Sequence, residues 1–353
     1  MFAQSRQNRH SERSPSCEAR IRIFAFFGCV LLIHAFGWGL FLLYAPAFPA
    51  MAGLGALAYS LGLRHAFDAD HISAIDDTAR FLIQKGKRPF GVGFFFSLGH
   101  STVVLVMTVA LAVAATSMRS AMPEFERYGT IVGASISGLF LWLIGILNLL
   151  VLIEIWKIWR LMRQGTYRPE RLEELLSQRG LANRVLAGRL QSLISHSWQL
   201  YPVGFLFGLG FDTASEIGLL ALAAGAATER IPVLAITSLA LLFASGMSFM
   251  DTVDGMFMVG AYGWAFSSPL RKIYYNITIT SLSIAVALLI GTVELLQVLV
   301  ASLGLHGKFF HALSAISFQT LGYLIVAFFL VGWGSSVVLW KVRRIEERWS
   351  LAR

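Results

Sequence analysis

The chain has 353 residues, of which 56% are hydrophobic and only 14% are charged, whereas about a quarter of the residues in an average soluble domain are charged. The apolar residues gather in runs long enough to cross a bilayer as helices, which excludes a soluble domain, and the short alternating segments of an outer-membrane barrel are absent. The excess of 29 Lys and Arg over 20 Asp and Glu is attributed to cytoplasmic loops rather than to nucleic-acid binding.

Eight apolar segments predict an all-α, polytopic membrane protein. They follow a polar, arginine-rich arm, and because no small-residue cleavage site accompanies the first segment, that segment is expected to remain as a helix. The predicted spans cover residues 23–44, 51–80, 90–117, 130–156, 199–227, 232–262, 273–303 and 312–340. Each is near or above the roughly 20 residues that a bilayer requires.

Loop charges predict the orientation of these spans. The loops after spans two, four and six and the tail after span eight are rich in Lys and Arg, whereas the alternate loops carry little net positive charge. Because Lys and Arg accumulate on the cytoplasmic side, both termini are expected in the cytoplasm of a bacterial cell, inside its inner membrane. The predicted divisions are a basic cytoplasmic arm (1–22), a first membrane half (23–156), a cytoplasmic loop (157–198), a second membrane half (199–340) and a cytoplasmic tail (341–353).

Three short sequence matches predict an internal repeat. "LGLRHAFD" at residue 61 resembles "FGLGFDTA" at 207, "FSLGHS" at 96 resembles "FASGMS" at 243, and "LIGILNLL" at 143 resembles "LIGTVELL" at 289. Chance similarity between leucine-rich helices would explain one match, but three in register favour a repeat of spans two to four as spans five to seven. Since span two runs inward and span five outward, the repeat would be inverted, as in many secondary transporters.

Ionisable residues recur inside the predicted spans, where each costs at least ~2.5–3.5 kcal/mol at a helix centre and is functional by default. Acids outnumber bases, which favours a cation as the ligand. Imidazole with carboxylate suits a divalent first-row metal, whereas calcium and magnesium prefer oxygen alone. The candidate metal ligands are His65, Asp68, Asp70 and His71 in span two, His100 in span three, Asp212 and Glu216 in span five, and Asp251 and Asp254 in span six.

Span two carries the densest group of these residues. On a straight helix, His65, Asp68 and His71 would fall within an arc of about 120° and face one ion. Asp70 would point elsewhere, so either it orients a histidine from behind or the helix is distorted at this point. No packing requirement explains two histidines and two aspartates in seven residues flanked by apolar sequence.

Other ionisable residues have plainer interpretations. Asp251 and Asp254 would simply be solvated if they lay at the cytoplasmic end of span six. Asp76, Asp77 and Arg80 are expected to form a cluster at the membrane interface, because they immediately precede a basic loop.

The segments "RHAFDADHI", "FSLGHSTVV", "LGFDTASE" and "GMSFMDTVDG" resemble, in this order, the signatures of the nickel/cobalt transporter family. The resemblance extends from about residue 23 to 340 and implies an eight-helix secondary permease that imports Ni²⁺ or Co²⁺. It departs slightly from the family at Ser215 and Phe67. The essential metal-handling positions of the family match His65, Asp70 and His71, and its other motif positions match His100, Asp212, Glu216, Asp251 and Asp254.

Rival functions lack their own motifs. A membrane metalloprotease would need H-E-x-x-H, and an ATP-driven pump would need G-x-x-x-x-G-K-[ST], and neither occurs. A metal exporter remains the alternative among transporters, and an intramembrane metalloenzyme is a more distant one. We therefore expect no enzyme activity and no cofactor. The expected partners are a divalent transition-metal ion and the lipid bilayer, without nucleic acid or an obligatory protein partner.

Two further residues are predicted to set the choice between nickel and cobalt. Affinity alone would favour copper and zinc over both, so selectivity must come from geometry. Phe67 lies between the two histidines of span two and is expected to limit how closely that span approaches span one. His34 in span one is expected either to add a ligand or to be a hydrogen-bonded packing residue.

Overall fold

The computed structural model describes residues 17–48, 51–114, 122–163, 194–209, 231–265, 277 and 280–342, and within these ranges the regular elements are all helices. The all-α prediction is therefore confirmed for this part of the chain. The helices are α1 (Cys17–Tyr44), α2 (Ala52–His65), α3 (Ala69–Gln84), α4 (Val92–Ala114), α5 (Met122–Arg163), α8 (Leu200–Gly208), α10 (Val233–Ala265), α12 (Ser281–Leu303), α13 (Lys308–Ser314) and α14 (Phe318–Val342), with 3-10 turns η2 (Ala45–Ala47) and η5 (Ser197–Gln199).

Five of the described helical segments are long and apolar enough to cross a membrane. They are Ala19–Ala47, Val92–Ala110, Ile131–Leu150, Val233–Tyr262 and Ser281–Leu303, and they correspond to predicted spans one, three, four, six and seven. On α1, Phe24, Leu31 and Phe36 are 73%, 69% and 64% exposed, as expected where a helix presents apolar side chains to lipid. The chain is therefore a multi-pass membrane protein.

Span two is not the single helix over 51–80 that the sequence predicted, because it is divided into α2 and α3. At the junction the amide of Asp68 donates to the carbonyl of His65 at 2.9 Å, a spacing of three residues that ends the α-helical pattern. Asp68 is extended, with φ −65° and ψ 145°, and its carbonyl accepts a hydrogen bond from the amide of Ile72. It thus occupies the N-cap position of α3, where aspartate is favoured. Of the two alternatives that the sequence left open for Asp70, a distortion of the helix at this point is observed.

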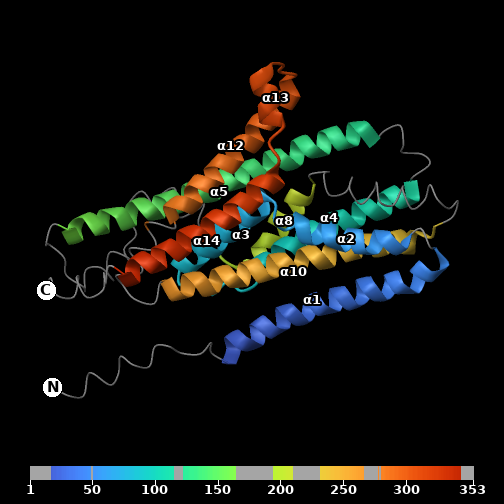
Figure 1. Cartoon of the computed structure of the whole chain (residues 1–353), viewed down its shortest axis with the longest axis horizontal. Coiled ribbons are helices and arrows are strands. Elements are labelled where there is room, and N and C mark those ends of the chain that lie inside the picture. The colour runs from blue at the N-terminus through green and yellow to red at the C-terminus, as the bar shows by residue number, and fades with distance from the viewer. Residues whose placement is uncertain are drawn as a thin grey trace.

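Helix α3 lies at the centre of the described structure. From Ala69 to Leu82 every residue except Asp70 is buried. The helix contacts α5, α10, α12 and α14, and Figure 1 shows it between α14 and α10. Around it, α10 contacts α1, α2 and α4, while α5 pairs with α12 and α4 with α8. Because protein encloses α3, its polar side chains face other helices instead of lipid.

Glycines allow two pairs of helices to approach backbone to backbone. Between α2 and α10, a Cβ atom at Gly62 would overlap the carbonyl oxygen of Phe243. Between α8 and α4, a Cβ atom at Gly204 would overlap the carbonyl oxygen of Phe96. The two phenylalanines begin the recurring segments "FASGMS" and "FSLGHS". These close contacts fix α2 and α8 beside the two helices that carry those segments.

Candidate metal site

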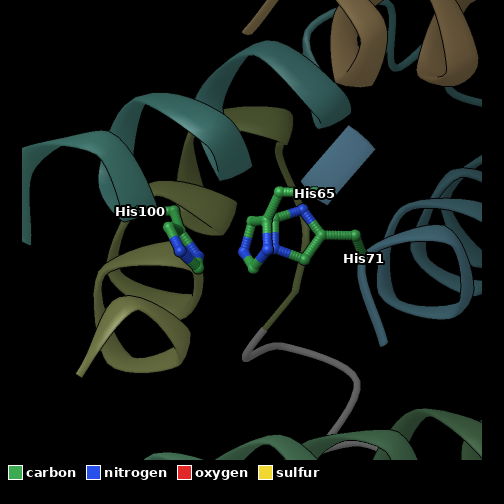
Figure 2. Close-up of side chains that lie close together, drawn as sticks. All are labelled: His65, His71 and His100. Atoms are coloured by element: carbon green, nitrogen blue, oxygen red, sulfur yellow. The ribbon is translucent and has the colours of Figure 1, made fainter. Parts of the chain in front are cut away.

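Three histidines from three helices meet beside the junction between α2 and α3. His65 ends α2, His71 lies in the first turn of α3, and His100 lies inside α4. One ring nitrogen from each lies within 4.8 Å of the other two, and Figure 2 shows the rings gathered at one point. His71 and His100 are 0% and 3% exposed, and the His65 side chain is 15% exposed. This histidine cluster has the ligand type and arrangement of a site for one divalent first-row metal ion.

The break between α2 and α3 gives Asp68 a different position from the one predicted on a straight helix. Its Oδ2 lies 2.9 Å from Nδ1 of His65, and the third imidazole of the cluster comes from His100 on α4. A carboxylate on one ring nitrogen fixes the ring and raises the basicity of the other nitrogen. Asp68 is therefore placed to orient His65.

Asp251 of α10 makes the equivalent contact with His71. Its Oδ2 lies 3.3 Å from Nδ1 of His71, and both side chains are fully buried. In the tautomer with a proton on Nδ1, His71 donates to Asp251 and keeps the lone pair on Nε2. Within the described part of the chain, that Nε2 has no hydrogen-bond partner. Burial excludes the interpretation of Asp251 as a solvated group at the end of span six.

Asp70 and Asp254 lie near the cluster without belonging to it. Oδ1 of Asp70 accepts a hydrogen bond from the backbone amide of His71 at 3.0 Å, which fixes the start of α3. Asp254 follows Asp251 by one turn on α10, and its Oδ2 is buried with no hydrogen-bond partner among the described residues. The predicted ligands Asp212 and Glu216 lie outside the described residues.

Two aromatic rings beside the cluster were not identified from the sequence. The ring of Phe96 is 4.9 Å from that of His71, centroid to centroid and edge to face, and the ring of Phe243 is 5.6 Å from that of His65. Both are completely buried. They exclude water on these sides, and a lower local dielectric strengthens the attraction between an ion and the nearby carboxylates. The sequence did contain a signal for them, because Phe96 and Phe243 are the first residues of the recurring segments "FSLGHS" and "FASGMS".

The structure places the predicted selectivity residues away from the cluster. In His34, Nδ1 lies 2.8 Å from the carbonyl of Val30 and Nε2 lies 3.2 Å from the hydroxyl of Tyr59, so both nitrogens have partners. The ring of Phe67 is 5.7 Å from that of Tyr323 on α14. Phe67 therefore contacts α14, and its role in the spacing between spans two and one stays a prediction.

A second polar group on α3, which the sequence predicted as a cluster at the membrane interface, is buried among the helices. Nη2 of Arg80 donates to Oδ2 of Asp76 at 2.8 Å, and the hydroxyl of Tyr262 on α10 donates to Oδ1 at 2.6 Å. Arg80 also donates to the hydroxyl of Tyr262, and the hydroxyl of Ser283 on α12 donates to Asp76. The sequence did not predict this burial, which follows from the central position of α3. We call these four residues the arginine cluster.

Asp77 adjoins the arginine cluster on the α5 side. Its Oδ1 accepts a hydrogen bond from Nδ2 of Asn148 on α5 at 2.9 Å, and both side chains are buried. A comparable polar contact joins α5 to α12, where the hydroxyl of Ser137 lies 2.9 and 2.8 Å from the two carboxylate oxygens of Glu294. Buried polar side chains thus connect α3, α5, α10 and α12 by hydrogen bonds.

Comparisons with known proteins show that the chain is similar to proteins named for nickel and cobalt transport. Residues 51–339 match the family described as "High-affinity nickel-transport protein". The chain is 48% identical over 331 residues to the nickel transporter NixA of Staphylococcus aureus, covering 94% of this chain and 98% of that protein. It is 46% identical over 329 residues to the high-affinity nickel-transport protein NixA of Helicobacter pylori (91% and 97%) and 40% identical over 329 residues to the cobalt transport protein NhlF of Rhodococcus rhodochrous (90% and 92%). No solved structure matches the chain.

Proposed function

Because this chain belongs to the high-affinity nickel-transport protein family, we propose that it is a secondary transporter that imports Ni²⁺, and also Co²⁺, into the cytoplasm. The observation that carries the proposal is the histidine cluster, which is buried among helices that cross the membrane. Imidazole ligands suit nickel and cobalt, and three of them around one point have no role in packing apolar helices.

The dimensions of the histidine cluster fit a site that must close upon its ion. Metal–nitrogen bonds to a first-row ion such as zinc are about 2.0–2.1 Å long, so two nitrogens on one ion lie at most about 4 Å apart. The cluster holds its three nitrogens within 4.8 Å of one another, so a shift of less than an ångström per ring completes it. We infer that the junction between α2 and α3 provides this shift, because His65 and His71 lie on opposite sides of it.

Carboxylates complete the proposed site. Asp68 and Asp251 hold the rings of His65 and His71, and their negative charges offset part of the charge of a divalent ion. Asp70 fixes the backbone at the start of α3. By their place in the motif "LGFDTASE", Asp212 and Glu216 are proposed to approach the ion from span five, and Asp254 from span six.

The proposed architecture has eight spans, with spans two to four repeated in inverted orientation as spans five to seven. Its support is the reciprocal packing of α2 on α10 and of α8 on α4, in which Gly62 meets Phe243 and Gly204 meets Phe96. In the same way Gly246 and Gly99 each approach the backbone of a tyrosine on the partner helix. In the proposed repeat these contacts favour a correspondence of Gly62 with Gly204 instead of Gly208, a register that differs by four residues in span five.

Membrane potential is the proposed energy source, with both termini in the cytoplasm of a bacterial cell. A divalent ion that moves inward across 100 mV gains roughly 4.6 kcal/mol, twice the value for a single charge. That energy supports about a 10³-fold accumulation without ATP. The direction of transport in this proposal is import, because an inside-negative potential draws a divalent cation inward.

The proposal is tested by uptake of ⁶³Ni²⁺ into proteoliposomes that contain only the purified chain. With an inside-negative potential, the wild-type protein should accumulate nickel, and His65→Ala or His71→Ala should not. His306→Ala is the matched control, because His306 is exposed and lies outside the histidine cluster. Wild-type uptake in either cluster variant, or accumulation that requires an added ATPase and ATP, would show that the proposal is wrong.

A further inference from the structure

Helices α3 and α10 run side by side in the same direction. His71 meets Asp251, Asp76 meets Tyr262, and Arg80 meets Tyr262, with separations of 180, 186 and 182 residues along the chain. Between these contacts, a Cβ atom at Gly255 of α10 would lie 3.5 Å from the side chain of Ile75 on α3. One continuous helix–helix interface therefore leads from the histidine cluster to the arginine cluster.

This interface carries carboxylates along its length, and we call it the acidic seam: Asp251, Asp254 and Asp76. From His71 to Arg80 it extends nine residues, or about 13 Å at 1.5 Å per residue. That is close to half the thickness of the ~30 Å hydrocarbon core. If the histidine cluster lies near the midplane, the seam reaches the inner boundary of the membrane.

Two oxygens in the seam lack the partners that buried carboxylates normally have. Among the described residues, Oδ1 of Asp251 and Oδ2 of Asp254 are buried and accept no hydrogen bond, and the Asp251 side chain is 0% exposed. Buried acceptors without donors are rare in folded proteins, because each costs the desolvation of a polar group. Both oxygens lie between a cluster suited to a metal ion and a carboxylate that already holds a cation.

That cation is the guanidinium of Arg80. It is fully buried, donates to Asp76 and Tyr262, and lies over the ring of Tyr262 at 4.6 Å from the centroid. A buried ion pair of this kind is poor support for stability, because well-packed apolar residues often serve equally well. An arginine in a membrane interior instead marks a functional position, where it pairs with acids on an ion pathway.

We propose that the acidic seam is the inward half of the ion's path, and that Arg80 is a tethered cation which occupies its last carboxylate, Asp76, whenever no metal ion is there. The ligand is a divalent transition-metal ion, held by carboxylate oxygens of Asp254 and Asp76. Oxygen ligands bind nickel and cobalt less strongly than imidazoles do, so the ion passes from a tight site to a weaker one before release. On its arrival it displaces the guanidinium from Asp76.

This inference rests on the proposed transport function. The number of metal ions bound per chain tests the role of Arg80 separately from that function. The purified full chain is titrated with Co²⁺ and ⁶³Ni²⁺ at equilibrium, and the ligands are identified by X-ray absorption. The wild-type protein should hold one ion with nitrogen ligands. Arg80→Gln should hold a second, weaker ion with oxygen ligands only, and that second ion should persist in Arg80→Gln/His71→Ala.

Transport kinetics give an independent readout. Arg80→Gln should lower the maximal uptake rate by about tenfold or more, the effect of losing a charge-assisted hydrogen bond, while KM changes little because the histidine cluster is intact. Arg80→Lys is the conservative control and should retain a single bound ion and most of the rate. If Arg80→Gln were defective only because its structure is disturbed, Arg80→Lys would not be expected to restore both the uptake rate and the binding of a single ion.

If Arg80→Gln does not fold, Tyr262→Phe tests whether Arg80 keeps a second metal ion from binding at Asp76. It removes a hydroxyl from Asp76 and Arg80 without leaving a charge uncompensated, and it should allow a second ion to bind, more weakly than in Arg80→Gln. A single nitrogen-bound ion in every folded variant, with wild-type kinetics, would overturn the role of Arg80. Absence of uptake and of any bound ion in the wild-type protein would instead overturn the proposed transport function.

Discussion

Two buried polar clusters each include residues of α3, and they differ in whether their polar atoms already have hydrogen-bond partners. In the histidine cluster, three imidazoles surround one point, and Nε2 of His71 has no hydrogen-bond partner among the described residues. In the arginine cluster, both oxygens of Asp76 accept hydrogen bonds, from Arg80, Tyr262 and Ser283. Both clusters include residues of α3 and contact α10. We propose that the first receives a cation, whereas the second already contains one, the guanidinium of Arg80.

The two clusters also differ in what they contribute to the stability of the fold. A polar cluster whose atoms lack partners until a ligand binds contributes little to the free energy of folding. Its side chains can therefore be changed with limited loss of stability. A completed ion pair differs, because removal of one partner leaves a buried charge uncompensated. Transport and stability should therefore respond in opposite ways to substitutions in the two clusters.

The largest effect is expected on transport from His100→Ala. Loss of the third imidazole should reduce nickel uptake below detection, because two nitrogens cannot enclose the ion. The free energy of unfolding in detergent should fall less than in Asp76→Ala. The measurement pairs ⁶³Ni²⁺ uptake with thermal unfolding of the same preparation. An unfolding defect in His100→Ala as large as that of Asp76→Ala would remove the distinction between the clusters.

The next effect concerns the arginine cluster. Asp76→Ala should destabilise the protein by about 3–5 kcal/mol, because the guanidinium of Arg80 remains buried without its carboxylate. The double variant Asp76→Leu/Arg80→Met should recover most of that stability while transport stays impaired. Denaturant unfolding in detergent provides the measurement. If the double variant recovered both stability and uptake, the ion pair would have no part in transport.

A smaller effect is expected from Asp251→Asn, which keeps the shape of the side chain and removes its charge. Partners that orient a metal-binding histidine typically contribute 10–100-fold in affinity, so nickel should bind more weakly by about that factor. The readout is the stabilisation by added nickel, about 2.7 kcal/mol for the wild-type protein at 100 times Kd. At the same nickel concentration the variant should show much less. Equal stabilisation would mean that Asp251 does not act through His71.

The smallest effects are expected at the two proposed selectivity positions. Phe67→Val should alter the ratio of nickel to cobalt uptake by a few-fold at most, since the ring contacts α14 and acts only through the junction beside His65. His34→Asn should do the same or less, because both of its nitrogens are engaged by Val30 and Tyr59. Competition of graded Co²⁺ against labelled Ni²⁺ measures the ratio. Unchanged ratios in both variants would assign selectivity to other residues.

The sequence identified the histidines of the cluster because motifs and membrane depth both point to them. It did not predict that Asp68 pairs with His65, since that depends on the break, and residues 66–68 contain neither proline nor glycine to signal one. It predicted Asp76, Asp77 and Arg80 as an interfacial cluster because basic residues of the next loop follow closely, and it did not predict that protein buries them. Burial of that segment is set by contacts with α10 and α12, which come much later in the chain. Such distant contacts leave no local pattern.

The central position of α3 also has a consequence for the biogenesis of the protein. Its 16 residues include Asp70, Asp76, Asp77 and Arg80, and each such charge at the centre of a helix disfavours insertion into lipid by about 2.5–3.5 kcal/mol. The groups that hydrogen-bond to Asp76 from α10 and α12 are synthesised 186 and 207 residues later. On its own, α3 is therefore not expected to insert stably into the bilayer when it leaves the ribosome. We expect it to remain at the membrane surface or in the insertion machinery until α10 and α12 have been synthesised and can pack against it.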